Sequence, residues 1–236
     1  MDLVAELRAA LAGVRGFQTE ARDVSAEARR GLEFYPVIGL AIGVVAAIAA
    51  NATARLVPRA AGFAGFLVLT VLGGPRNAAA TAAAAGVVSD RPAPRLGEAA
   101  AAGLLLALKC AGLVVLPPPA RTAALVLAPL LGTWALVVQC YGPRAASGGE
   151  ARSLIGGAGF REFGVASLFA FGVTFGLAQA IGLTVAVVAA LVTIGLRVVA
   201  HRRADGMTPA LAAATRELVE TGVVGALALL AVGPRL

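Results

Sequence analysis

The chain has 236 residues, of which 59% are hydrophobic and only 14% are charged. A soluble domain has no interior large enough for so much apolar surface, so the composition predicts an integral membrane protein. The formal net charge of +7 does not indicate a nucleic-acid-binding protein, because aromatic residues make up only 5% and do not alternate with runs of basic residues.

Residues 1–33 are predicted to form an amphipathic helix on the cytoplasmic side, followed by a polytopic membrane domain at 34–236. Apolar residues recur there at three- and four-residue spacing, namely Leu3, Leu7, Leu11 and Val14. Such a helix would lie along the membrane surface or pack on the ends of the spans, and both alternatives stay open. The many charges in this segment argue against a cleavable signal peptide.

Seven long apolar runs follow, and a membrane-spanning helix needs about 20 residues. The runs lie near 34–54, 59–74, 99–118, 121–141, 163–179, 181–199 and 217–233. The fifth and sixth form one apolar stretch, which we divide between Gln179 and Gly182 because a single helix would be too long for the bilayer. The predicted fold class is therefore an all-α integral membrane protein with about seven transmembrane helices, six being the alternative.

Basic residues predict the orientation of these spans. With the N-terminus in the cytoplasm, 15 of the 20 basic residues fall in cytoplasmic segments and four fall outside, while Lys109 lies within the third span. The positive-inside rule supports this topology. It places 75–98, 142–162 and 200–216 on the cytoplasmic face, where we expect any site to open.

Several residues with chemically versatile side chains have simple structural interpretations. Cys110 and Cys140 lie in or beside apolar runs, which is typical of small apolar filling residues rather than a disulfide or a metal pair. His201 lies among arginines and is predicted to be solvated in a loop. Trp134 is predicted to pack within its span.

Four stretches with recurring glycines and charged residues occur in order along the chain. They are Arg30-Gly31 with Tyr35-Pro36-Val37-Ile38-Gly39-Leu40-Ala41-Ile42-Gly43; Gly73-Gly74 with Gly86; Gly132-Thr133-Trp134-Ala135; and Thr208-Pro209-Ala210 with Glu217-Leu218-Val219-Glu220. Together with Lys109, they resemble the cobalamin-5'-phosphate synthase family, the adenosylcobinamide-GDP ribazoletransferases.

The resemblance is incomplete at the acidic positions. The family has Gly-Gly-x-His-x-Asp-Gly-x-x-Asp-x-x-Asp-Gly in the second stretch, where the histidine position here is Arg76. The aspartate positions of the second and fourth stretches hold alanine instead, at Ala78, Ala82, Ala85 and Ala210. A segment that carries a further family aspartate is missing before Lys109.

The resemblance implies a role in cobalamin (vitamin B12) biosynthesis at the bacterial cytoplasmic membrane. The implied reaction joins activated cobinamide, supplied as adenosylcobinamide-GDP, to α-ribazole or its 5'-phosphate, releases GMP and requires Mg²⁺. The implied partners are the lipid bilayer, these two substrates and other cobamide-assembly membrane proteins, and no nucleic acid is expected.

The alanines bear directly on the implied chemistry. Positions 78, 82 and 85 share one face of a helix, so aspartates there could bind one or two divalent ions. Alanine has no side-chain oxygen, and we therefore predict no metal ligand at these positions. The ribazoletransferase hypothesis consequently stands beside that of a non-catalytic relative, a scaffold or a binder of a corrinoid or nucleotide. A small transporter is a third hypothesis, which a lysine within a span would permit.

The candidate substrate-binding residues are charged and near the predicted cytoplasmic face: Arg76, Arg91, Arg95, Lys109, Glu217 and Glu220. The three arginines bind phosphate or merely set the topology. Lys109 faces a substrate phosphate, or else it snorkels or pairs with Glu98. Glu217 and Glu220 are one helical turn apart and could share a cation or a basic partner, although the simpler interpretation makes them charges at the start of a helix. No catalytic residue is assigned.

Overall fold

The structure is a computed structural model that describes residues 3–15, 29–74, 81–84, 95–142 and 154–232. Within these residues every long element is a helix, and the only β-type pairing is an isolated bridge between Tyr141 and Ala158. The predicted all-α class is confirmed for this part of the chain.

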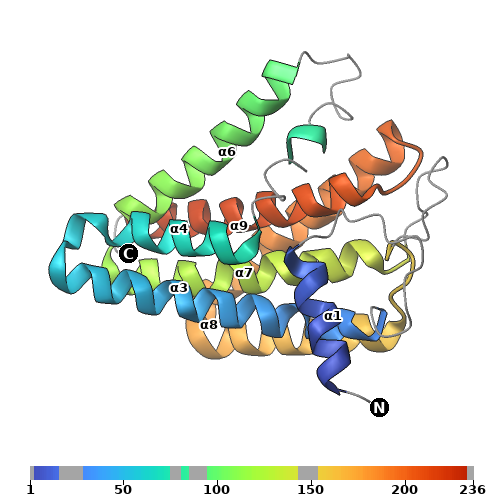
Figure 1. Ribbon diagram of the computed structural model, residues 1–236, viewed down its shortest axis with the longest axis horizontal. Coiled ribbons are helices and arrows are strands. Elements are labelled where there is room, and N and C mark those ends of the chain that lie inside the picture. The colour runs from blue at the N-terminus through green and yellow to red at the C-terminus, as the bar shows by residue number, and fades with distance from the viewer. Residues whose placement is uncertain (1–2, 16–28, 75–80, 85–94, 143–153, 233–236) are drawn as a thin grey trace.

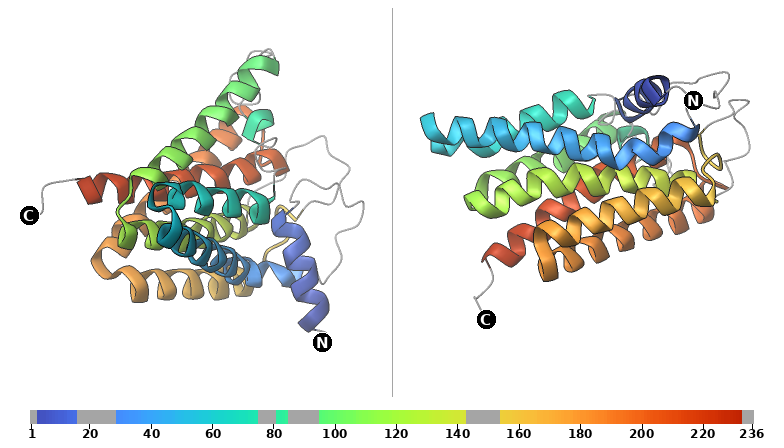
Figure 2. Two further views of the ribbon diagram at one scale, coloured as in Figure 1. Left: turned by 60° about the vertical axis from the view of Figure 1, so that its left-hand side comes forward. Right: turned by 90° about the horizontal axis from the view of Figure 1, so that it is seen from below.

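Most of the helices run along one long axis (Figure 1). In chain order they are α1 (Leu3–Arg15), the 3₁₀ helix η1 (Gly31–Phe34), α3 (Tyr35–Leu56), the 3₁₀ helix η2 (Pro58–Ala60), α4 (Ala61–Gly73), α6 (Arg95–Val115), α7 (Pro118–Cys140), α8 (Phe160–Arg203) and α9 (Pro209–Val232). Proline lies in the first turn of α3, α7 and α9, where its missing N–H group would have no intrahelical partner anyway. The short helix α1 crosses the bundle near the end where α3 and α8 begin (Figure 2).

Helix α7 forms the centre of the bundle. Nearly all of its side chains from Ala124 to Cys140 are buried, and it packs against α3, α8 and α9. Helix α6 packs against α9 and α4 but leans away from the bundle toward its first residues (Figure 2). Because α7 is covered on all sides, it shows no polar face, whereas the peripheral helices expose apolar side chains.

Glycines allow the central helices to approach closely. A Cβ atom placed on Gly43 of α3 would lie 2.6 Å from the carbonyl oxygen of Leu125 in α7. A Cβ on Gly62 of α4 would lie 2.5 Å from the carbonyl oxygen of Leu113 in α6. Small residues at such crossings are typical of helices that pack in membranes.

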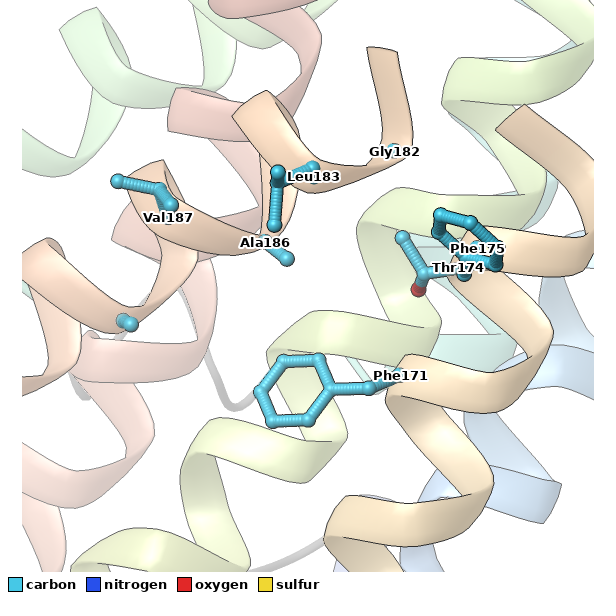
Figure 3. A pocket seen from close by; sticks show the side chains of 8 residues that line it. Phe171, Thr174, Phe175, Gly182, Leu183, Ala186 and Val187 are labelled. Atoms are coloured by element: carbon cyan, nitrogen blue, oxygen red, sulfur yellow. The ribbon is translucent and has the colours of Figure 1, made fainter. Parts of the chain in front are cut away.

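Helix α8 consists of two arms joined by a sharp reversal at Gln179, whose φ and ψ are 45° and −123°. The arms meet closely, since a Cβ on Gly182 would lie 2.6 Å from the carbonyl oxygen of Thr174. The division predicted between Gln179 and Gly182 is thereby confirmed. A pocket of about 340 Å³ lies between the arms, lined by apolar side chains such as Phe171 and Leu183 (Figure 3).

Three of the described helices are long and apolar enough to cross a membrane: Gly31–Leu56, Pro118–Cys140 and Phe160–Arg203. Shorter apolar helices cover Pro58–Gly73 and Ala99–Val115. The structure therefore agrees with a membrane protein, while the number of spans stays a prediction.

The last helix begins earlier than predicted. It begins at Pro209 rather than near residue 217, because the hydroxyl of Thr208 accepts a hydrogen bond from the N–H of Leu211 at 3.2 Å. Threonine is a favoured residue at this capping position. The charged residues between 216 and 220 consequently lie inside α9, and not at its start.

The leucines of helix α1, on which the prediction of its apolar face rested, do not form the face that packs on the bundle. The buried residues are Glu6, Ala10 and Val14, whereas Leu7 and Leu11 are 37% and 45% exposed. Of the predicted helix at 1–33, residues 16–28 lie outside the described part of the chain.

The close crossing of α3 and α7 predicts that one methyl group added at this crossing lowers the stability of the fold, whereas the same group added elsewhere does not. We expect Gly43→Ala to lower the free energy of unfolding by about 1–3 kcal/mol, because its Cβ has no space beside Leu125. Gly172→Ala is the matched control, since a Cβ there meets no atom within 4 Å. The midpoint of thermal unfolding in detergent is measured for both variants, with size-exclusion chromatography to detect the folded protein that remains. Equal midpoints for the two variants would contradict this packing.

Candidate functional site

The most polar part of the interior lies between α6 and α9. The Nζ atom of Lys109 in α6 is 2.7 Å from Oε2 of Glu217 and 2.5 Å from Oε2 of Glu220, both in α9. Lys109 is only 2% exposed and Glu220 likewise. The lysine therefore bridges two carboxylates that lie one turn apart on the facing helix.

Arg216 extends this pairing to two further helices. Its Nε donates a hydrogen bond to Oε1 of Glu220 at 2.8 Å. Its Nη1 donates to the carbonyl oxygens of Val14 at 2.8 Å and Gly73 at 3.2 Å. These carbonyls belong to the last turns of α1 and α4, where no intrahelical donor is available and a positive charge is favourable.

Lys109, Arg216, Glu217 and Glu220 together form what we term the charge cluster. Two cations balance two carboxylates, so the group is neutral as a whole. Among the described residues, no buried side-chain nitrogen or oxygen lacks a hydrogen-bond partner. Complete pairing is the condition under which charged groups can be buried in an apolar bundle.

Glycines of the sequence motifs pack directly on the charge cluster. A Cβ on Gly73 would lie 2.9 Å from Nη2 of Arg216, and a Cβ on Gly132 would lie 2.7 Å from Cγ of Glu220. Gly74 has a φ of 96°, a left-handed conformation that favours glycine. The second, third and fourth motifs and Lys109 therefore converge on one place, although they are far apart in the sequence.

The space beside the charge cluster is very small. A cavity of about 10 Å³ is lined by Thr70, Gly73, Gly74, Lys109 and Glu217 together with two leucines. This volume suits roughly one water molecule. A nucleotide or a corrinoid does not fit between Lys109 and Gly74.

The described residues do not fit a carboxylate-bound Mg²⁺. Ala82 is half-buried in the helical residues 81–84, Ala210 lies in the first turn of α9, and Ala78 and Ala85 lie outside the described residues. Glu217 and Glu220 are engaged by Lys109 and Arg216. In the described part of the chain, no three His, Cys, Asp or Glu side chains gather where they could hold a metal ion.

The structure brings together only some of the candidate substrate-binding residues. Lys109, Glu217 and Glu220 are in direct contact, which agrees with the hypothesis of a shared basic partner and shows that the helix-start interpretation of the glutamates is wrong. Arg95 is the first residue of α6, but its side chain, like that of Glu98, is outside the description. Arg76 and Arg91 also lie outside the described residues.

The residues with simple interpretations mostly behave as predicted. Trp134 packs 4.8 Å from the ring of Phe171, and its Nε1 donates to the hydroxyl of Ser167 at 3.0 Å. Cys110 and Cys140 are free thiols. His201 is exposed as predicted, but it lies in the last turn of α8 instead of in a loop.

A second polar network was not predicted from the sequence. Nε2 of Gln139 donates to the carbonyl oxygen of Thr193 at 2.9 Å and to the hydroxyl of Thr215 at 3.2 Å. Arg197 donates to the carbonyl oxygens of Val138 and Tyr141 at the end of α7. The network ties α7 to α8 and α9. The presence of Gln139 inside an apolar span could have predicted this network, because polar residues in spans generally face a partner.

Comparison of the sequence with known proteins shows which family the motifs belong to. The family model described as cobalamin-5-phosphate synthase matches residues 93–228, which is more than half of the chain. The match includes Lys109, Gly132, Glu217 and Glu220. It begins after Ala78, Ala82 and Ala85, but it includes Ala210, the aspartate position of the fourth stretch. No curated protein and no solved structure matches the chain.

The charge balance of the cluster predicts a non-additive pair of substitutions. Lys109→Met leaves two buried carboxylates with a single cation, and we expect it to destabilise the fold by about 3–5 kcal/mol. Adding Glu217→Gln restores neutrality and should recover a large part of this loss. The free energy of unfolding is measured in a denaturing detergent for both variants, for Glu217→Gln alone and for the parent chain, which gives a double-mutant cycle. A double variant no more stable than Lys109→Met would contradict the pairing.

Proposed function

Because the chain belongs to the cobalamin-5-phosphate synthase family, we propose that it acts in cobalamin biosynthesis at the step that joins activated cobinamide to α-ribazole or its 5'-phosphate. It would do so as an adenosylcobinamide-GDP ribazoletransferase-type protein in the bacterial cytoplasmic membrane. The N-terminus is proposed to lie in the cytoplasm, in keeping with the distribution of the basic residues.

The observation that carries this proposal is the convergence of the motif residues on the charge cluster. Lys109, Glu217 and Glu220 are charged residues within an apolar bundle, and burying such residues is costly. Gly73 and Gly132, which belong to two other motifs, provide the space that the cluster needs. Residues from four separate segments are thus fitted to one another at the place where the motifs resemble those of the family.

The proposed substrates bind on the outer side of this cluster. The cavity beside Lys109 holds about one water, so the substrate phosphates would lie beyond Gly74 rather than within the bundle. Arg76, Arg91 and Arg95 are the proposed phosphate contacts, because guanidinium groups match phosphate oxygens in charge and geometry.

A second candidate function is binding of the same ligands without turnover. Two observations favour it: alanine occupies the aspartate positions, and Glu217 and Glu220 are already paired with Lys109 and Arg216. Transfer at a diphosphate needs positive charge beside the leaving phosphate, and a neutral cluster supplies none.

Complementation of cells that lack the synthase tests the two candidates together. The parent chain is compared with the variant Ala78→Asp/Ala82→Asp/Ala85→Asp, and cobalamin formation from adenosylcobinamide-GDP is then measured in purified membranes with Mg²⁺. If carboxylates limit the reaction, the variant should form product about 100-fold faster than the parent, because a lost electrostatic contact of this kind generally costs that much in rate.

Binding of adenosylcobinamide-GDP to the same membranes separates the remaining outcomes. Binding with product formation by the parent supports the transferase, whereas binding without product supports the non-catalytic relative. Absence of binding by a correctly folded parent chain would contradict the proposed function as a whole.

A further inference from the structure

The apolar face of α1 is left exposed in the part of the chain that the structure describes. Val4, Leu7 and Leu11 are 55%, 37% and 45% exposed, although they lie on a helix that is firmly attached to the bundle. Three exposed apolar residues on one face of a helix indicate an interaction site, whereas single exposed apolar residues are common on protein surfaces.

The attachment of α1 shows that this exposure is a property of the fold. Its inner face is held by the ion pair of Glu6 with Arg30 at 3.8 Å and by the hydrogen bond from Arg216 to the carbonyl of Val14. The packing is close, because a Cβ on Gly31 would lie 3.0 Å from the carbonyl oxygen of Glu6. Rotation of α1 to bury its leucines would break these contacts.

The uncovered face forms one wall of a groove of about 500 Å³. Ile38, Ala41, Ile42 and Val45 of α3, together with Leu72 of α4, form the opposite wall. The volume lies within the range of roughly 300–1,000 Å³ that is usual for sites that bind small molecules. Its apolar lining suits a hydrocarbon chain.

Two arginines give the groove a charge. Arg8 and Arg15 line it together with the apolar residues, and they lie two helical turns apart on the same face of α1. Both side chains are exposed, and neither forms an ion pair with any residue that the structure describes. Among the described residues that line the groove, none is acidic.

We propose that this groove binds an anionic phospholipid, with an acyl chain between α1 and α3 and the phosphate beside Arg8 and Arg15. The apolar walls explain the chain, and the two arginines, which have no ion-pair partner among the described residues, select an anionic headgroup over a zwitterionic one. Position supports the assignment, since α1 crosses the bundle near one end, where a helix of this kind would meet the headgroup layer (Figure 2). The lipid completes the burial of α1 and so stabilises the contact of its last turn with Arg216.

Lipid retention by the purified full-length protein tests this site. The protein in a neutral detergent is mixed with phosphatidylglycerol or phosphatidylcholine, and bound lipid is counted by native mass spectrometry. We expect phosphatidylglycerol to be preferred, and Arg8→Gln/Arg15→Gln to weaken its binding by about 25-fold, at roughly fivefold for each basic residue. Arg59→Gln/Arg202→Gln is the matched control, because it removes the same charge from exposed positions outside the groove.

A groove-filling variant tests the apolar half of the site. Ala41 is exposed in the groove, so Ala41→Trp should exclude the acyl chain without changing any charge. Equal retention of the two lipids, an equal loss in the control variant, or full phosphatidylglycerol binding by Ala41→Trp would each overturn the proposal. Displacement of the lipid by inorganic phosphate alone would also overturn it, since the site would then recognise only an anion.

Discussion

The relative positions of four helices in this protein depend on ion pairs between buried basic and acidic side chains. Lys109 and Arg216 pair with Glu217 and Glu220, and the same arginine closes the last turns of α1 and α4. An unpaired ion in this environment would be strongly destabilising, so each member fixes the position of the others. The helices α1, α4, α6 and α9 are thereby held in one arrangement by interactions that apolar packing alone could not specify.

The motif residues of the family can be explained by this arrangement without reference to a metal ion. Gly73 and Gly132 leave space for Arg216 and Glu220, and Gly74 adopts a left-handed conformation. The same positions could support an adjacent metal centre in a relative that has aspartates, but here they surround a cluster that is complete by itself. In this chain the glycines, Lys109 and the two glutamates of the motifs are therefore retained where the aspartates are not.

Local features could be predicted from the sequence, and long-range partners could not. The reversal at Gln179 follows from an apolar stretch too long for one helix, and the burial of Trp134 follows from its surroundings. The start of α9 was placed too late, because its internal charges were interpreted as a helix end while Thr208 and Pro209 supply the actual start. Lys109 and Glu217 are 108 positions apart, and spacing contains no information on such a pair.

A Mn²⁺ titration tests most directly whether Glu217 and Glu220 pair with basic side chains of the protein or bind a divalent metal ion. The purified full-length protein in neutral detergent is titrated with Mn²⁺, and the free ion is followed by electron paramagnetic resonance. Carboxylates that are paired with Lys109 and Arg216 predict the same free signal as in the protein-free control. Stoichiometric loss of that signal, abolished by Glu217→Gln/Glu220→Gln, would contradict the account.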